Sequence, residues 1–333
     1  MKIVFFGTDS LAAESLQALC AKFSVVAVVT VPDAPVGRKQ VLTESEVAVA
    51  ARTLGLPVHK PESLKQNAEL EATLRELAAD VFVVAVYGKI IPQSILDIPP
   101  LGSVNVHPSL LPLYRGPAPI RTPLRNGDTE TGVSIMLMDE QVDHGPLLAA
   151  EKVAIAPDDT NVTLTAKLSA IAAPLLVRAL EGYVAGTITP TAQDHEKATT
   201  TKFVTKADGK IDWNNTAQDI YNQYRACQPW PGIYTTLPAI ASAKDGRNSK
   251  LLKITSCSIY SDSSPILGEV RRGETTPGTV LPDGIVSCGP QTLNGVEAPT
   301  YLQILTLQPE GKQPMDIKSF LNGNKEFVGG VVG

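Results

Sequence analysis

Three apolar runs constrain the fold of this 333-residue chain more than any other feature of its sequence. Residues 2–6 (KIVFF), 24–30 (SVVAVVT) and 80–87 (DVFVVAVY) are almost uninterrupted apolar segments, and helices are predicted between them at 10–21 and 69–79. Runs of this length and character are typical of parallel strands that are covered by helices on both faces. The sequence therefore predicts an α/β, Rossmann-like N-terminal domain with an open, mostly parallel sheet.

The turn after the first run argues against a dinucleotide site. It reads Gly7-Thr8-Asp9, with one glycine, whereas the GxGxxG fingerprint needs three so that a pyrophosphate can approach the backbone. A nicotinamide-dependent dehydrogenase is therefore disfavoured. Ligands of open α/β sheets still bind beyond the carboxyl ends of the strands, which directs attention to Tyr87 and Gly88 after the third run.

The second half of the chain has a different pattern. A long amphipathic helix is predicted at 161–183, followed by a polar segment without periodicity, and we predict an interdomain linker at 190–207 that holds an exposed His195. A helix at 216–227, short β-rich runs at 233–237, 251–260, 279–288 and 300–307, and a last helix at 316–321 follow. The expected domains are residues 1–189 and a smaller β-barrel (OB-like) domain at 208–333.

Composition excludes several classes of protein. The formal net charge of −5 is not that of a generally basic nucleic-acid binder. The four cysteines lie far apart without a CxxC pair, which predicts reduced thiols and neither a disulfide framework nor a zinc site. The N-terminal apolar run is too short for a signal peptide or a membrane span, so we expect a cytoplasmic protein without a membrane partner.

Candidate catalytic residues cluster in the stretch 102–145. Residues 103–107 alternate like a strand, which places Asn105 and His107 on the same face, and a second apolar run at 133–138 leads to Asp143. An amide donor, an imidazole and a carboxylate are suited to acyl-group transfer. Taken singly, a histidine before a proline is more often a strand-end residue bonded to the backbone, and an aspartate in such a turn is more often a turn former than a base.

The sequence motifs of this stretch indicate a function more specifically than its single residues do. It resembles the 10-formyltetrahydrofolate-dependent formyltransferases at NVH (105–107), SLLP (109–112), RG (115–116), API (118–120), TGV (131–133) and DxG (143–145). The resemblance implies that Asn105, His107 and Asp143 are catalytic, that 10-formyltetrahydrofolate is the co-substrate, and that no metal is required. Pro108 and His144 depart from the family, which has glycine at the first position and threonine or alanine at the second.

The same resemblance implies a pterin pocket. It assigns to this pocket the residues Tyr87, Gly88, Ile90, Ser109, Leu110, Leu111, Pro112, Met138 and Val142. From the residues alone, core packing is an equally good interpretation of Ile90 and of Ile91.

A loop after the second strand indicates the acceptor. Its PDxPxGR pattern (32–38) resembles the insertion loop of the family members that act on initiator methionyl-tRNA, which implies that Arg38 and Lys39 bind tRNA. Gln40 and Val41 stand where lysines are usual. GKIDWN, RACQPWPG and LQPEGKQPM resemble the C-terminal domain of the same members.

Several alternatives remain open at this stage, and all but one share the formyl chemistry. These are a sugar-nucleotide N-formyltransferase, a glycinamide ribonucleotide formyltransferase, a formyltetrahydrofolate hydrolase, and a non-catalytic folate- or tRNA-binding protein. We expect a monomer.

Overall fold

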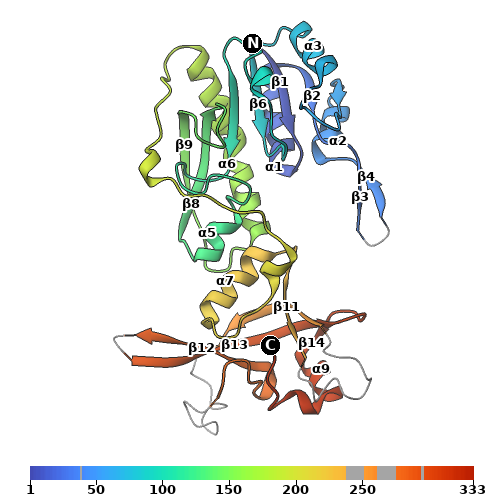
Figure 1. The fold of residues 1–333 in the computed structure, drawn as a ribbon, viewed down its shortest axis with the longest axis vertical. Helices are drawn as coiled ribbons and strands as arrows, with labels where there is room; N and C mark the ends of the chain where they lie inside the picture. The colour runs from blue at the N-terminus through green and yellow to red at the C-terminus, as the bar shows by residue number, and fades with distance from the viewer. Residues whose placement is uncertain (38–39, 238–250, 261–274, 294–295) are drawn as a thin grey trace. The chain divides into compact units, whose positions relative to one another are not determined.

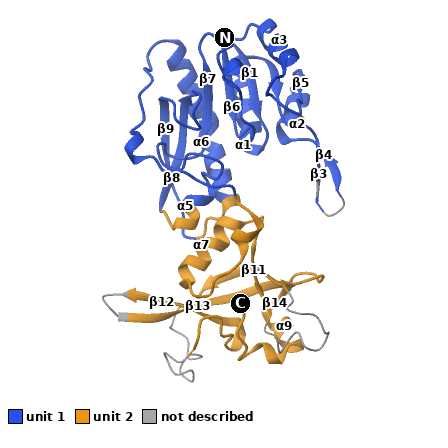
Figure 2. Cartoon of the chain, in the orientation of Figure 1, with its two compact units in different colours: residues 1–123, 129–157, 163–203 blue, residues 124–128, 158–162, 204–333 orange. Residues whose placement is uncertain are grey.

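The computed structural model describes residues 1–37, 40–237, 251–260, 275–293 and 296–333, and it divides into two compact units (Figures 1 and 2). Unit 1 comprises residues 1–123, 129–157 and 163–203, and unit 2 comprises 124–128, 158–162 and 204–333. Arg38 and Lys39 lie outside the described residues.

Unit 1 is built on a seven-stranded sheet with the order β5-β2-β1-β6-β7-β8-β9. The first five strands of that order pair in parallel, whereas β8 and β9 are antiparallel, which confirms the predicted mostly parallel sheet. In chain order the strands are β1 Lys2–Gly7, β2 Ser24–Val29, β5 Val58–His59, β6 Val81–Ala85, β7 Ser103–His107, β8 Glu130–Leu137 and β9 Leu147–Ala154.

Helices pack beside this sheet (Figure 1). They are α1 Ser10–Cys20, α2 Glu46–Thr53, α3 Ala68–Glu76, α4 Gln93–Leu96 and α6 Asn161–Val184. Helix α5 (Arg121–Asn126) begins in unit 1 and ends in unit 2. The Asp9 carboxylate accepts a hydrogen bond from the Ala12 amide and so caps α1, which is why the chain turns sharply into a helix after β1. On one face of the sheet Phe6 packs against Phe82 and Tyr87, with ring centroids 5.4 and 5.6 Å apart.

Helix α6 is long and apolar enough to cross a membrane by length and composition alone. One face of it is nevertheless buried inside the protein, since Leu164, Leu168 and Leu176 have no exposed area, whereas Val162 and Val184 near its ends are 53% and 49% exposed. We therefore assign α6 to the protein core.

A hairpin occupies the segment that the sequence predicts only as a loop. Strands β3 (Ala34–Val36) and β4 (Val41–Thr43) pair with each other in antiparallel fashion and form a separate two-stranded sheet. Sequence patterns missed these strands because each has only three residues and β3 contains Pro35, which is tolerated at the edge of a sheet.

Unit 2 contains an antiparallel half-barrel sheet with the order β10-β11-β13-β12, and β14 pairs with β13, in agreement with the predicted barrel-like domain. Its core includes Ile220 and the packed rings of Phe320 and Phe327. The elements are α7 Ala217–Cys227, β10 Ile233–Thr236, β11 Leu251–Ile259, β12 Ile285–Leu293, β13 Val296–Pro309, β14 Met315–Asp316 and α9 Ile317–Gly323.

The strand predicted at 279–288 starts later than expected. Residues 282–284 (Pro-Asp-Gly) form a turn with Asp283 at φ 58°, and β12 begins only after it, at Ile285. Thr279 and Val280 form isolated bridges instead of a continuous strand. The Pro-Asp-Gly sequence is a strong turn signal that should have divided the apolar run.

All four cysteines are free, as their spacing predicts. Cys227, Cys257 and Cys288 are buried, and burial raises the thiol pKa values of Cys257 and Cys288. These thiols are therefore inert parts of the unit 2 core rather than nucleophiles.

Candidate active site

Strand β7 presents the first two candidate residues, Asn105 and His107. Both point to the same side of the strand, as the alternation predicts, and they are 9% and 4% exposed. In the antiparallel pairing Met136 of β8 lies opposite Asn105 and Ser134 lies opposite His107. Both polar side chains are thus held on a buried central strand, which restricts their rotamers.

Asp143 reaches these residues from the loop between β8 and β9. Its Oδ1 lies 3.3 Å from Asn105 Nδ2 and 3.5 Å from His107 Nδ1, and its Oδ2 accepts a 2.7 Å hydrogen bond from the Gly116 N–H. Its backbone has φ 50°, a left-handed conformation that non-glycine residues adopt at a cost of about 1–3 kcal/mol. The structure therefore brings the three predicted catalytic residues together around one carboxylate.

His107 is held by both ring nitrogens. Nε2 lies 3.0 Å from the carbonyl oxygen of Tyr114, and because a carbonyl only accepts, Nε2 carries a hydrogen in this contact. Nδ1 then faces the Asp143 carboxylate, where it can accept or release a proton. This geometry is suited to general acid–base work by a histidine–aspartate pair.

The segment Ser109–Pro112 lies against β8. Ser134 Oγ donates to the Ser109 carbonyl oxygen at 2.8 Å and accepts from the Leu111 N–H at 3.0 Å, while Ser109 Oγ donates to the Leu113 carbonyl oxygen at 2.6 Å. Ser109 and Leu111 are buried, whereas Leu110 and Pro112 are half-buried. The Ser109 hydroxyl and the Leu111 N–H thus hold this loop in shape.

The remaining predicted pocket residues divide between core and surface. The Tyr87 ring is buried, its hydroxyl has no hydrogen-bond partner within the described part of the chain, and burial raises its pKa to about 12. Met138 packs against the same core cluster. Gly88 has φ 77°. Ile90 and Val142 are 86% and 66% exposed, so their apolar side chains are open to a ligand.

The exposed fractions distinguish Ile90 from Ile91, which the sequence alone could not distinguish. Core packing is wrong for Ile90, which is exposed, and correct for Ile91, which is 8% exposed and belongs to the cluster around Phe6 and Phe82.

Sequence reasoning missed a polar network beside Asp143. Gln193 is 6% exposed, and its Nε2 donates to the carbonyl oxygens of Asp143 and Gly145 at 3.0 and 2.7 Å. Its Oε1 accepts from Arg115 Nη2 at 2.7 Å. Gln193 lies in the polar, aperiodic segment that the sequence assigns to a linker, and nothing in that pattern marks it as buried.

The network continues to two histidines. Arg115 Nη2 donates to His195 Nδ1 at 2.8 Å, and the exposed His195 ring stacks on His144 with centroids 4.1 Å apart. His144 Nδ1 lies 2.7 Å from Asp139 Oδ2. This pairing gives the unusual His144 a structural partner on each side.

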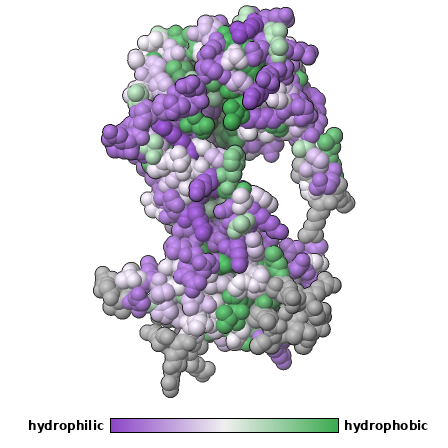
Figure 3. Space-filling view, in the orientation of Figure 1, coloured by the Kyte–Doolittle hydropathy of each residue, from purple (hydrophilic) through white to green (hydrophobic). Residues whose placement is uncertain are grey.

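The β3–β4 hairpin is exposed and is fixed at its base. Val41 and Leu42 are 58% and 68% exposed, and Figure 3 shows hydrophobic residues, in green, on the surface of the hairpin. At the base, Lys60 Nζ lies 2.6 Å from Asp33, directly before β3, and 2.9 Å from Glu44, directly after β4. These bonds raise the pKa of Lys60 and lower that of Glu44, so both remain charged at neutral pH.

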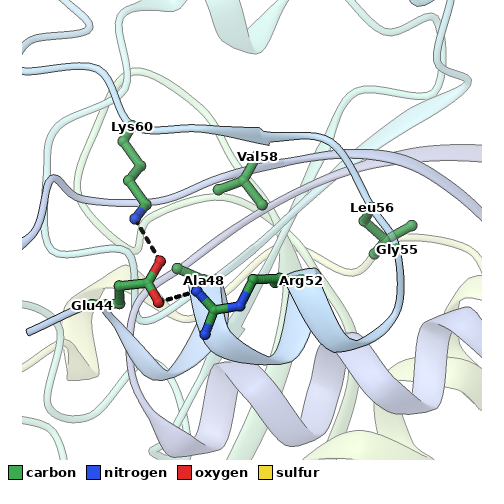
Figure 4. Close-up of a pocket in the computed structure, with 7 residues that line it drawn as sticks. All are labelled: Glu44, Ala48, Arg52, Gly55, Leu56, Val58 and Lys60. Atoms are coloured by element: carbon green, nitrogen blue, oxygen red, sulfur yellow. Dashed lines mark hydrogen bonds and ion pairs between the residues drawn. The ribbon is translucent and has the colours of Figure 1, made fainter.

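Figure 4 shows Lys60 and Arg52 approaching the Glu44 carboxylate from two sides. They line a pocket of about 430 Å³ together with Ala48, Gly55, Leu56 and Val58. None of the predicted catalytic residues lines this pocket, and we assign it no chemistry. In the part of the chain that the structure describes, no group of three histidine, cysteine, aspartate or glutamate side chains is arranged to hold a metal.

Comparisons with known proteins agree over both units. A family model described as formyl transferase matches residues 1–180, and one described as formyl transferase, C-terminal domain, matches residues 204–325. Methionyl-tRNA formyltransferases from Roseiflexus castenholzii and Listeria innocua are each 41% identical, over 328 and 323 residues. The matches cover 97% of this chain and 96% and 95% of those proteins.

Solved structures share the fold at lower identity. The N-formyltransferase from Helicobacter canadensis, in complex with folinic acid and dTDP-3-aminofucose, has a TM-score of 0.61 at 18% identity and covers 91% of this chain and 99% of its own. HypX from Aquifex aeolicus, in complex with tetrahydrofolic acid, has a TM-score of 0.58 at 15% identity. The match covers 98% of this chain but 48% of HypX, so the chain spans about half of that protein.

Proposed function

This chain belongs to the methionyl-tRNA formyltransferases, and on that premise we propose how it carries a formyl group from 10-formyltetrahydrofolate to the α-amine of initiator methionyl-tRNA. One observation carries the proposal for the site. Asn105 and His107 approach the same oxygen of Asp143, and Gly116 holds the other oxygen. A neutral donor, a titratable ring and an oriented carboxylate are what an acyl transfer to an amine needs.

The chemistry follows from these positions. The amine nitrogen of methionine forms a bond to the formyl carbon, and the formyl oxygen becomes an oxyanion. Asn105 Nδ2 donates a hydrogen bond to that oxygen, and one such donor stabilises the transition state by about 3–4 kcal/mol. Because His107 Nε2–H is occupied by the Tyr114 carbonyl oxygen, the His107 ring can donate to the oxyanion only from Nδ1, after it has taken up the proton of the amine. The proton lost by the amine passes to the Asp143–His107 pair. It returns to N10 of the folate as the bond from N10 to the formyl carbon breaks.

We propose that the folate lies along the segments 87–90, 109–112 and 138–142. Exposed Ile90 and Val142 offer apolar contact to a pterin ring. The Tyr87 hydroxyl, which has no hydrogen-bond partner among the described residues, lies on the same segment as Ile90. Ser109, Leu110, Leu111 and Pro112 form the ordered loop between the catalytic strand and Tyr114. This donor set of backbone and apolar groups suits a neutral, planar ring better than a phosphate.

We propose that the acceptor tRNA meets the β3–β4 hairpin through Arg38 and Lys39, and that unit 2 also binds tRNA. Support for the hairpin comes from its exposed apolar strand β4 and its anchored base. Arginine and lysine side chains next to such a surface are suited to phosphate contacts. We also propose that the protein acts in the cytoplasm and as a monomer.

One assay tests the proposed acceptor and donor together. Formyl-labelled 10-formyltetrahydrofolate is incubated with the protein and, in parallel, with methionyl initiator tRNA, a dTDP-linked amino sugar, or water alone. We expect label on methionyl-tRNA at a rate at least about 100-fold above that of the sugar or of hydrolysis. Preferential labelling of the amino sugar, or release of formate at the same rate without an acceptor, would contradict the proposal.

A further inference from the structure

We propose that Gln193 is a positioning residue that holds Asp143 in its catalytic conformation, an inference that rests on the catalytic role proposed for Asp143. The Gln193 side chain is almost fully buried, and both ends of its amide are used. The nitrogen donates to the carbonyl oxygens of Asp143 and Gly145, and the oxygen accepts from Arg115. One amide thus connects the β8–β9 loop to the loop after β7.

Asp143 needs such support because its backbone conformation is unfavourable. With φ at 50°, it stays in the left-handed region only if its surroundings hold it there. The chain next to it is tightly packed, since a Cβ on Gly145 would lie 2.0 Å from the Leu137 carbonyl oxygen. The two bonds from Gln193 fix the carbonyls on either side of residue 144, and therefore the direction in which the Asp143 carboxylate points.

The loop after β7 holds Asp143 in two ways at once. The Gly116 N–H donates directly to the carboxylate, and the neighbouring Arg115 side chain holds Gln193, which holds the backbone. Arg115 is itself fixed, because its N–H donates to the Thr199 carbonyl oxygen and its carbonyl oxygen accepts from the Thr201 N–H, at 2.9 and 2.8 Å. The segment around Gln193 is therefore part of the support of the site.

Only an amide satisfies all three partners of Gln193. A methionine would fill the space but would leave the buried carbonyl oxygen of Gly145 and the partly buried one of Asp143 without this donor. A glutamate would keep the bond to Arg115 but would place a carboxylate oxygen against those two carbonyl oxygens. Both changes should displace Asp143 without removing any group that touches the substrates, and displacement by about 1 Å can cost on the order of 100-fold in rate.

The chain offers a matched control in unit 2. Gln223 is 2% exposed, and its Nε2 donates to the carbonyl oxygens of Asp208 and Lys210 at 2.7 and 2.9 Å. Gln223 therefore also donates two hydrogen bonds to backbone carbonyl oxygens from a buried amide. The segment that it binds contains none of the proposed catalytic residues.

The experiment compares Gln193→Met, Gln193→Glu, Gln223→Met and Asp143→Asn in the full-length protein. For each variant, kcat and both KM values are measured with 10-formyltetrahydrofolate and methionyl-tRNA, and thermal unfolding is followed at the assay pH. We expect both Gln193 variants to lower kcat by about 10- to 100-fold, with each KM within about threefold of the original. Gln223→Met should lower the unfolding temperature and leave kcat of the folded protein unchanged.

Two results would overturn the inference, and they differ from a failure of the proposed catalytic site. If Asp143→Asn abolishes transfer while Gln193→Met and Gln193→Glu keep full kcat, Gln193 does not position Asp143. If the Gln193 variants lose activity only in proportion to their unfolded fraction, as Gln223→Met should, the role of Gln193 is structural alone. Retention of full kcat by Asp143→Asn would instead refute the role of Asp143. If Gln193→Met does not fold, the kcat of Gln193→Glu, which keeps its bond to Arg115, tests the inference instead.

Discussion

The catalytic corner, by which we mean Asn105, His107, Asp143 and Gln193, and the β3–β4 hairpin belong to the same unit but are held in place by different kinds of interaction. At the corner, Asn105, His107 and Gln193 are buried and are fixed by contacts both to backbone carbonyl oxygens and to the side chains of Asp143 and Arg115. The hairpin is exposed, with all three residues of β4 accessible to solvent, and ion pairs between half-exposed side chains hold its base. Bond-making needs precise placement away from water, whereas contact with a large substrate needs reach.

The largest expected effect comes from breaking the corner at His107. His107→Ala removes a donor to the oxyanion and one half of the proton-transfer pair, so kcat should fall by about 10²–10³-fold. Folding and folate affinity should stay close to those of the original protein, because the ring contacts only Asp143 and the Tyr114 carbonyl in the interactions described. Single-turnover formyl transfer, together with folate binding by fluorescence, measures both. Transfer at the original rate would exclude His107 from the mechanism.

Sequence alone predicted the strand half of this corner. The period-two alternation in residues 103–107 places Asn105 and His107 on one face, and the structure confirms it. The loop half was harder, because β8 runs antiparallel to β7 and Leu137 lies opposite Val104, at the far end from His107. The loop that follows has to return along β7 before Asp143 can reach the site. Strand direction of this kind is not contained in a local pattern.

Gln193 could not have been predicted from its neighbours in the chain. It lies 50 residues after Asp143, in a polar segment whose composition is typical of exposed connections. Its position depends on long-range contacts, since Thr191, two residues before it, pairs with Leu147 at the start of β9 and the Gln193 side chain bonds to Arg115. The same limit applies to Ile90 and Ile91, which are identical in type but differ in exposure because only one faces the core.

The hairpin should affect one substrate only. Arg38→Ala should lower kcat/KM for methionyl-tRNA about tenfold or more, a loss of roughly 1–3 kcal/mol, because a planar guanidinium contacts phosphate or base edges and alanine cannot. The KM for 10-formyltetrahydrofolate should barely change. Steady-state kinetics with each substrate varied in turn, at fixed salt, measures this. Equal loss for both substrates would indicate that the hairpin supports the fold.

A weaker effect is expected at the base of the hairpin. Lys60→Met removes the cation that links Asp33 and Glu44, and so loosens the direction of the hairpin without touching its tip. Because partly exposed ion pairs contribute little, we expect KM for methionyl-tRNA to rise only about threefold, with kcat unchanged. The difference from the original protein should shrink as salt is added and the ion pairs are screened.

The control for Lys60 is an ion pair elsewhere in unit 1. Lys152 Nζ lies 2.7 Å from Glu130 between strands β8 and β9, so Lys152→Met removes the same charge without affecting the hairpin. Its KM for methionyl-tRNA should match that of the original protein. If both lysine variants raise KM equally, net charge and not the direction of the hairpin is responsible.

The smallest expected effect is at His144, which is next to the catalytic corner in the chain but is itself held by a partly exposed ion pair and a stacked ring. His144 lies directly after Asp143 in the chain, yet its side chain is about a quarter exposed and contacts only the outer part of the network, through Asp139 and the stacked ring of His195. His144→Thr should remove both contacts but leave the bonds of Gln193 to Asp143 and Gly145 intact, so kcat should stay within about twofold. If His144→Thr instead lowers kcat tenfold or more, measured beside Gln193→Met, then the stacked rings of His144 and His195 position the Asp143 carboxylate, and Gln193 is not the residue that determines its position.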